Sequence, residues 1–216
     1  MIKMFLTLSI LGTFMSKPTC AQVLGSWGAK IGVTSSAEVL QYVGGSTPSS
    51  ASKRRVGYAI GVFSEWFSTR YFSLTTEVDY TQGGSLQPYY TVIEPPVYAW
   101  TYLNDRVDYL SVLISPKLTL PLSPVAPYIF AGPRVDFQLS YHREDFGGLP
   151  IDFPMYERFK KVLLGATLGA GIYLRRTLPL PLLVEIRYDP DFTTPYKDAF
   201  LSIHSNAFDV LIGLQL

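Results

Sequence analysis

The sequence has few of the residues that stabilise or functionally define most small exported proteins. Cys20 is the only cysteine among 216 residues, so the chain cannot form an internal disulfide bond. Charged residues make up 16% of the chain, below the proportion of about one quarter that is usual in soluble domains. The formal net charge is +1, so the sequence lacks the bulk positive charge expected of a nucleic-acid-binding protein.

Long hydrophobic runs are also missing. A helix that crosses a bilayer needs ~20 consecutive apolar residues. Residues 4–15 form a shorter run, and residues 110–122 include Lys117 and two prolines. The sequence therefore predicts no membrane-spanning helix.

The first residues have the features of a secretory signal. A lysine precedes the uncharged apolar residues 4–15, and residues 19–21 offer small side chains at a cleavage site. We therefore expect a cleaved signal peptide over residues 1–21 and a mature domain over residues 22–216. Cys20 would leave with this leader. The alternative is a lipid-attachment cysteine, which the residues before Cys20 match poorly.

The most informative stretch is residues 126–141, where two sets of side chains alternate. The first set is apolar and consists of Ile129, Ala131, Pro133, Val135, Phe137, Leu139 and Tyr141. The second set becomes polar in its middle and consists of Tyr128, Phe130, Gly132, Arg134, Asp136, Gln138 and Ser140. An extended strand sends alternate side chains to opposite faces. The alternation continues beyond the ~5–6 residues of an ordinary strand, which favours a wall between lipid and a polar lumen.

The same alternation recurs along the chain and predicts eight strands. They cover residues 27–36, 55–67, 71–82, 106–120, 126–141, 159–175, 182–188 and 206–216. The four longer predicted connections are residues 37–54, 83–105, 142–158 and 189–205. The remaining pairs of consecutive strands are joined by short turns, so long and short connections alternate along the chain. This order is typical of a barrel with short periplasmic turns and longer outer loops. The predicted fold is an all-β, eight-stranded, antiparallel, up-and-down transmembrane β-barrel.

Charged side chains fall on the inward set of the predicted strands. We expect a structural charge network in the lumen that consists of Glu65, Glu77, Asp79, Lys117, Arg134, Asp136, Glu185, Arg187 and Asp209. The interior of a barrel with about eight strands is just filled by side chains. These charged groups would therefore pair with one another and leave no pore for solutes. The alternatives are a proton or ion path and a catalytic carboxylate pair.

Aromatic residues gather near the predicted strand ends, as interfacial girdles do. A carbohydrate-binding surface would use the same residue types. One group lies instead in the predicted loop 83–105 and is a candidate binding patch: Tyr89, Tyr90, Tyr98, Trp100 and Tyr102.

No catalytic residue, cofactor or metal site is predicted. Three glycines, Gly165, Gly169 and Gly171, lie within a period-two strand pattern and are expected to make room for bulky neighbours rather than to bind a dinucleotide. The histidines at positions 142 and 204 show no recognisable triad spacing. A cation site formed by the acids at positions 189, 191 and 198 is an open alternative, although acids in a loop are usually solvated.

Several segments together resemble the PorT-like family of outer-membrane β-barrel proteins. They are WGAKIG at residues 27–32, the strand 72–80 with its ending YTQG, YLSVLISPKL at 109–118, PY at 127–128 with AGP at 131–133, EIRY at 185–188, and the closing strand 208–216. The terminal Leu216 departs from the aromatic last residue common in other outer-membrane barrels.

The resemblance implies an integral protein of the cell outer membrane that contacts membrane lipid. One class of the family serves secretion and gliding machinery. The predicted outer loops also lead us to expect a protein partner, at the extracellular or periplasmic face. The expected role is structural, accessory or binding, without catalysis. The alternatives are a soluble exported lipocalin-like binding barrel and an outer-membrane enzyme.

Overall fold

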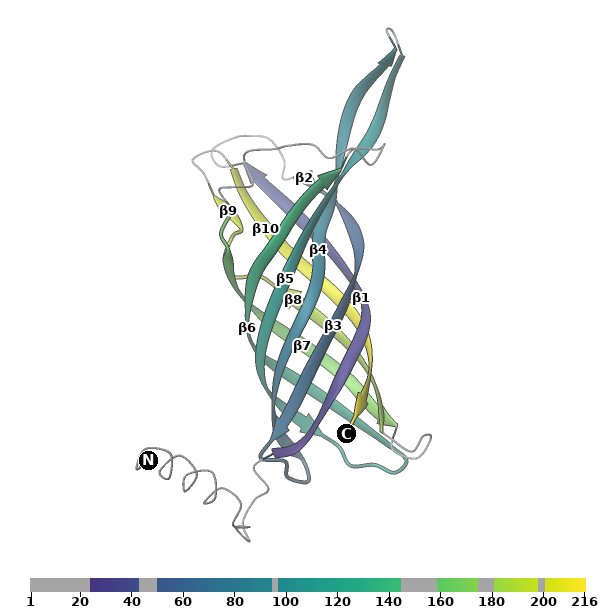
Figure 1. Cartoon of the computed structure of the whole chain (residues 1–216), viewed down its shortest axis with the longest axis vertical. Helices are drawn as coiled ribbons and strands as arrows, with labels where there is room; N and C mark the ends of the chain where they lie inside the picture. Colours follow the sequence, from purple (N-terminus) through teal and green to yellow (C-terminus); the bar gives the residue numbers. More distant parts are fainter. Residues whose placement is uncertain (1–23, 43–49, 95–96, 145–158, 175–180, 198–200) are drawn as a thin grey trace, which may run out of the picture.

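A computed structural model describes residues 24–42, 50–94, 97–144, 159–174, 181–197 and 201–216. Eight long strands form the wall: β1 (Leu24–Tyr42), β3 (Lys53–Trp66), β4 (Phe72–Glu94), β5 (Val97–Thr119), β6 (Val125–Glu144), β7 (Val162–Leu174), β8 (Leu182–Pro190) and β10 (Leu201–Gln215). Two short strands lie beside this wall: β2 (Ser50–Ala51) and β9 (Tyr196–Lys197). Figure 1 shows the wall as a tilted, elongated barrel. Among the described residues, no helix is long and apolar enough to cross a membrane.

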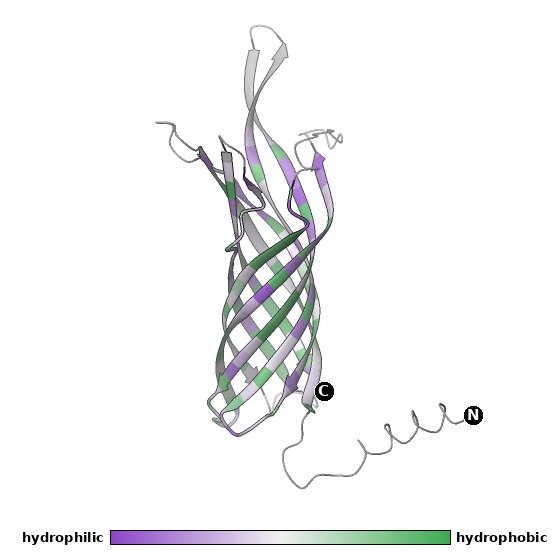
Figure 2. Ribbon diagram, turned by 90° about the vertical axis from the view of Figure 1, so that its left-hand side faces the viewer, coloured by the Kyte–Doolittle hydropathy of each residue, from purple (hydrophilic) through white to green (hydrophobic). Residues whose placement is uncertain are grey.

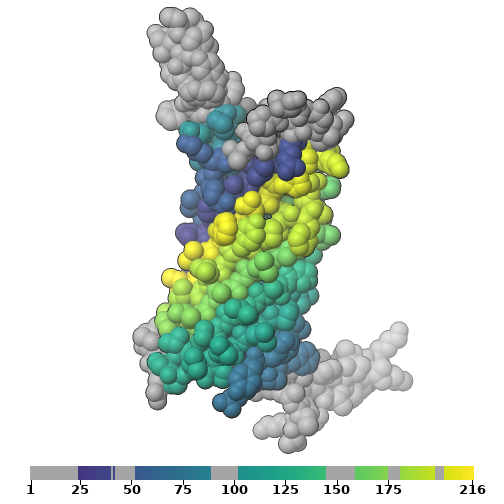
Figure 3. Space-filling model, turned by 180° about the vertical axis from the view of Figure 1, so that it is seen from behind, coloured from purple at the N-terminus to yellow at the C-terminus, as the bar shows by residue number. Residues whose placement is uncertain are grey.

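The sheet closes on itself. The long strands follow the order β1, β3, β4, β5, β6, β7, β8, β10, each antiparallel to the next, and β1 also pairs with β10. That last ladder joins the two ends of the chain and runs from Gly28–Gln215 to Tyr42–Leu201. In Figure 3 the yellow C-terminal strand accordingly lies beside the purple first strand. The prediction of an eight-stranded antiparallel barrel is confirmed.

The two faces of each strand differ as the alternation predicts. On β1, the side chain of Lys30 is 5% exposed, whereas Ile31, its neighbour in the chain, is 60% exposed. Figure 2 shows hydrophobic positions alternating with hydrophilic ones along the lower wall. Apolar residues therefore face outward around the barrel, as a lipid-facing surface requires.

β6 contains a β-bulge, and the residues beyond it face the opposite way from the prediction. Asp108 pairs with Ser140, but Tyr109 pairs with Gln138, so Leu139 is an extra residue on β6. The extra residue reverses the alternation beyond it. Ser140, expected to face inward, bonds the outer-wall residue Asp108. Tyr141, expected outward, packs against a buried cluster.

The region predicted as the loop 83–105 is instead a β-hairpin. β4 continues to Glu94 and β5 begins at Val97, with paired residues from Gln82–Asp108 to Glu94–Val97. Figure 1 shows this hairpin standing above the rest of the wall. The prolines and glycines favoured a loop, but the Tyr, Thr, Val and Ile residues between them have high β propensity. The hairpin residues that we discuss below lie on these extended strands.

The bounds of the other predicted loops also change. Two are shorter than predicted, because β1 continues to Tyr42 and β10 begins at Leu201, whereas β7 begins later than predicted, at Val162. Residues 145–158, in the third predicted loop, lie outside the described residues, as do the predicted signal peptide and Cys20. The tight turns between β3 and β4 and between β5 and β6 lie at the same end of the barrel as Leu216, as Figure 1 shows. The strand ends that the longer connections join, such as Tyr42 and Glu144, lie at the opposite end.

Part of the lumen near the short turns is apolar rather than polar. A buried cluster there consists of Phe63, Leu113, Ala126, Tyr128, Phe130, Tyr173 and Leu183. Gly169 makes room for it, since a Cβ at that position would lie 2.2 Å from the Phe130 ring. Gly171 does the same for Tyr128, where the nearest ring atom would be 2.5 Å away. The prediction that glycines accommodate bulky neighbours is confirmed for Gly169 and Gly171, whereas a Cβ at Gly165 would first meet the backbone oxygen of Pro190, at 2.7 Å.

Candidate functional site

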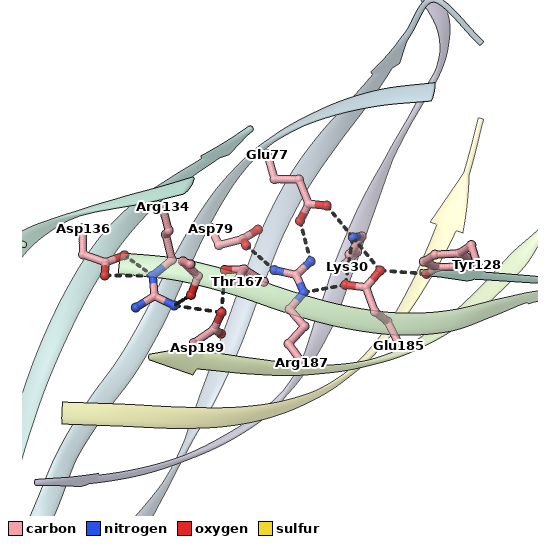
Figure 4. Close-up of polar contacts among 11 residues, drawn as sticks. Lys30, Glu77, Asp79, Tyr128, Arg134, Asp136, Thr167, Glu185, Arg187 and Asp189 are labelled. Atoms are coloured by element: carbon pink, nitrogen blue, oxygen red, sulfur yellow. Dashed lines mark hydrogen bonds and ion pairs between the residues drawn. The ribbon is translucent and has the colours of Figure 1, made fainter. Parts of the chain in front are cut away.

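The centre of the lumen is built around Arg187 of β8. Its guanidinium contacts carboxylates from two strands: Nη1 lies 2.9 Å from Asp79 Oδ2, Nη2 contacts Glu77, and Nε contacts Glu185. Figure 4 shows these three acids around the guanidinium. Alternation places Glu77 and Asp79 on the inward face of β4 and Glu185 on that of β8. Each of the three guanidinium nitrogens therefore contacts a carboxylate.

Lys30 of β1 extends this group across the lumen. Its Nζ lies 2.7 Å from Glu77 Oε1 and 3.1 Å from Glu185 Oε2. The Tyr128 hydroxyl donates to Glu185 Oε2 at 2.7 Å. The ammonium also lies 4.8 Å from the centre of the Phe63 ring. These bonds tie strands that are distant in sequence across the interior, as Figure 4 illustrates.

Arg134 of β6 organises a second group nearer the long connections. Its Nε, Nη1 and Nη2 lie 2.9 Å from Asp136, 2.8 Å from Asp189 and 2.5 Å from Asp191 respectively. The Thr167 hydroxyl donates to Asp189 Oδ1 at 2.5 Å. Asp191 follows the end of β8, so this group fastens the start of the β8–β10 connection to the wall.

A third group lies toward the short turns. Lys117 of β5 forms an ion pair with Glu65 of β3. Its Nζ donates to the Tyr173 hydroxyl at 2.7 Å, and this hydroxyl donates to Glu65 Oε1 at 2.6 Å. The three polar groups thus satisfy one another in a buried place.

A fourth group lies in the lumen toward the end of the barrel that carries the β4–β5 hairpin. Arg143 Nε and Nη2 lie 2.5 Å and 2.6 Å from the two carboxylate oxygens of Asp105, and Tyr141 donates to Oδ1 at 2.6 Å. Ser85 donates to Glu38 Oε2 at 2.9 Å. We refer to the four groups together as the lumen network.

The space left between these groups is small. The lumen cavity has a volume of ≈ 60 Å³, about that of one or two water molecules, and its lining includes Thr34 and Asp209. Thr34 Oγ1 and Asp209 Oδ1 have no hydrogen-bond partner among the described protein atoms. A cavity of this size has room for a few water molecules only.

The structure brings the predicted lumen residues together, apart from Asp209. All nine are buried, and eight of them form ion pairs with one another or with neighbours: Glu65, Glu77, Asp79, Lys117, Arg134, Asp136, Glu185 and Arg187. Asp209 lies beside the cavity without an ion-pair partner among the described residues.

Sequence reasoning missed several members of the network. Lys30 follows the same alternation, between the apolar residues Ala29 and Ile31, so the signal for it is present in the sequence. Asp189 and Asp191 were assigned to a loop, whereas both bind Arg134. Asp198, the third member of the alternative cation site, lies outside the described residues. Among the residues described, no group of three or more His, Cys, Asp or Glu has the arrangement to hold a metal ion.

The histidines give little sign of a catalytic site. His204 Nε2 lies 3.3 Å from Ser202 Oγ, because the two residues share one face of β10. This Ser–His contact was not foreseen. The described ion pairs include no carboxylate on His204. The contact therefore lacks the third group that orients the histidine in a triad.

The candidate binding patch lies on the β4–β5 hairpin. Pro88 pairs with Tyr102, and the same ladder pairs position 90 with 100 and position 92 with 98. These pairs are two residues apart along each strand, so they fall on one face of the two-stranded ribbon. Position 89 pairs with 101 and falls on the other face. The ring of Tyr102 lies beneath Lys53 of β3, with Nζ 4.3 Å from its centre.

The closed ring, outward apolar face and charged interior define the chain as a transmembrane β-barrel protein. Residues 21–194 match the family model described as "Outer membrane protein beta-barrel domain". Because the match covers most of the chain, the protein belongs to this family and resides in the outer membrane. The comparisons show membership at this level and not that of the PorT-like group in particular. They give no support to the lipocalin-like alternative.

Several solved structures are similar in fold. Ail, the attachment invasion locus protein of Yersinia pestis, is 12% identical, with 89% of this chain and 99% of that chain covered and a TM-score of 0.46. Neisserial surface protein A is 14% identical, with 86% and 96% covered and a TM-score of 0.42. The outer membrane protease OmpT of Escherichia coli is 9% identical, with 92% and 98% covered and a TM-score of 0.44. None of the proteins of curated function matches this sequence significantly.

Proposed function

We propose that the protein is a membrane-anchored binding protein that presents the β4–β5 hairpin to a partner outside the cell. The observation that carries this proposal is the contrast between a filled lumen and a hairpin that extends beyond the rest of the wall. A filled interior serves as a rigid support, whereas a ribbon that projects beyond the wall can reach a partner. The short turns and Leu216 lie at the end that faces the periplasm in barrels of this kind, so the hairpin would face outward.

The composition of the hairpin supports a binding role. The register brings Tyr90 opposite Trp100, with Tyr98 and Tyr102 at neighbouring pairs of the same face. Tyr and Trp contribute large contact areas at low conformational cost and are enriched at recognition surfaces. We propose a protein or carbohydrate partner for this face, without catalysis.

Further parts of the proposal concern export and assembly. Residues 1–21 would direct export and be removed, leaving residues 22–216 in the membrane. The PorT-like resemblance supports a link to secretion machinery, in which the barrel would be an accessory component. An alternative enzymatic role has no carboxylate-supported Ser–His pair among the described residues.

The proposal is tested by changing the two hairpin faces separately. Replacing Tyr90 and Trp100 together by serine should remove the partner from native complexes resolved by non-denaturing electrophoresis of solubilised outer membranes. Replacing Thr91 and Ala99 by serine alters the adjacent pair on the opposite face and should leave these complexes intact.

A shortened hairpin gives a second variant. Residues 88–102 are replaced by Asn-Gly, a dipeptide suited to a two-residue turn between the paired Gln87 and Leu103. The barrel should still show heat-modifiable gel mobility, because the residues that pair across the wall below are unchanged. Complexes that persist in both the shortened and the serine variants would contradict the proposal.

A further inference from the structure

Four basic residues lie together on the outer wall, and they face away from the lumen network. Lys53, Arg54 and Arg55 are consecutive on β3, and Arg106 lies on β5. We call them the outer basic cluster. We propose that this cluster binds the phosphate groups of a lipid headgroup in the outer leaflet.

Arg54 reaches across β1 toward β10 on the outside of the barrel. Its Nε donates to Ser35 Oγ at 3.0 Å, its Nη1 donates to Asn206 Oδ1 at 3.0 Å, and its Nη2 contacts the Ser35 carbonyl oxygen. The guanidinium carbon lies 4.9 Å from the centre of the Phe208 ring. These neutral partners fix the guanidinium in position and leave its charge uncompensated.

Arg55 reaches in the opposite direction, over β4. Its Nε donates to Asn104 Oδ1 at 2.9 Å, and its Nη1 donates to the Gly83 carbonyl oxygen at 3.3 Å. β3 gains one residue relative to β4 between Arg54 and Ala59, which is a bulge. Because of this irregularity, two successive arginines can both lie on the outer wall rather than on opposite faces.

The cluster carries a surplus of positive charge. Arg106 is neutralised by Asp108, with Nε–Oδ1 and Nη2–Oδ2 distances of 2.8 Å. Among the described residues, no carboxylate lies within ion-pair distance of Lys53, Arg54 or Arg55. Besides Asp108, Glu144 on β6 also interacts electrostatically with Arg55. Counted over the described residues, four cations against two carboxylates give this cluster a net charge of +2.

The cluster begins where the outward apolar surface ends. Val56, the next residue of β3, is 69% exposed, and Tyr58 follows on the same face with its ring 5.7 Å from that of Tyr80. On the other side, the Phe208 ring beneath Arg54 lies 4.7 Å from the Tyr188 ring. Outward aromatic rings of this kind mark the level of the membrane interface.

This position determines the ligand class. A cation directly above an aromatic belt lies at the depth of lipid phosphates, and guanidinium groups match the geometry of phosphate oxygens. The β4–β5 hairpin lies at the same end of the barrel, which we propose faces outward, so the lipid belongs to the outer leaflet. Acyl chains of that lipid would cover the exposed apolar residues below the cluster.

The experiment measures lipid retention by native mass spectrometry of the full-length mature barrel released from detergent. The probe is diphosphoryl lipid A. The wild-type protein should retain it, and the variant K53Q/R54Q/R55Q should bind it roughly 100-fold more weakly, since each basic residue near an anionic lipid surface contributes a factor of about five. The variant R70Q removes an exposed arginine near Tyr71, at the end with the short turns, and should bind like the wild type. The change R54K/R55K should retain most of the binding.

Two further probes distinguish the source of the phosphate. Fully dephosphorylated lipid A should bind as weakly to the wild type as diphosphoryl lipid A binds to the triple variant. Inorganic phosphate at millimolar concentration should not displace the lipid, because it lacks acyl chains. Heat-modifiable mobility verifies that each variant is folded. Equal retention by wild type and triple variant, equal binding of the dephosphorylated probe, or displacement by inorganic phosphate would each overturn the proposal.

Discussion

The lumen network and the outer basic cluster use the same residue types in opposite ways. In the lumen, Arg187 contacts three carboxylates and is almost completely buried. On the outer wall, Arg54 is exposed, and its contacts within the described part of the chain are with neutral oxygens and a ring. Desolvation explains the difference, because a buried charge is tolerated only when its hydrogen bonds and its charge are both matched. An exposed cation has no such requirement and can retain its charge for a ligand.

This contrast separates stability from binding. The lumen charges join strands from all around the ring, so their loss should loosen the whole barrel. The outer cations lie on one side of the upper wall, and their contacts reach no farther than the second strand on either side of β3. We therefore expect large changes in the free energy of unfolding from the interior and small ones from the outer cluster.

The largest effect is expected from Arg187→Met. The substitution keeps an unbranched side chain but leaves Glu77, Asp79 and Glu185 close together with less compensating charge. Breaking a buried ion pair in this way costs about 3–5 kcal/mol. The matched variant Arg54→Met should change stability by less than about 1 kcal/mol. Denaturant unfolding in lipid vesicles, followed by tryptophan fluorescence, measures both values, and equal losses would contradict the division between the two regions.

The second effect concerns the two faces of β6. Val135→Arg puts a charge on the lipid-facing surface near the middle of the apolar band and should cost ~2–4 kcal/mol. Ser140→Arg should cost only ~0–1 kcal/mol, because the bulge turns this residue outward at the level of Arg106 and Asp108. The same unfolding assay compares the two variants. A larger loss for the Ser140 variant would restore the inward placement that simple alternation gives.

Alternation predicted most of the wall from the sequence. It placed Lys117 and Arg187 inside and Val56 and Ile129 outside, because one rule with a period of two governs every regular strand. The rule has no information about an added residue, and it consequently failed at Ser140, beyond the bulge. A bulge arises from backbone pairing with a neighbouring strand, which a single segment does not encode.

Loop assignments failed for a related reason. Pro88 and nearby glycines indicated a loop, yet β4 and β5 support each other through the ladder that extends to Glu94 and Val97. Tertiary pairing here overrides local propensity. Which residues pair within the lumen network could not be predicted from the sequence either. The sequence placed Glu65 and Tyr173 on strands but gave no reason to bring them together, since their contact depends on barrel tilt and stagger.

The smallest effect tests whether the hydroxyl groups of the interior matter individually. The Tyr173 hydroxyl accepts from Lys117 and donates to Glu65, so Tyr173→Phe removes two buried hydrogen bonds and retains the ring. Lys117 and Glu65 still pair directly, which limits the expected loss to about 1–2 kcal/mol. Tyr71→Phe removes a hydroxyl from an exposed ring at the same end of the barrel and should leave the unfolding midpoint unchanged. If the two variants unfold alike, the direct ion pair alone satisfies this part of the lumen, and the contrast between inside and outside rests on charge rather than on hydrogen bonding.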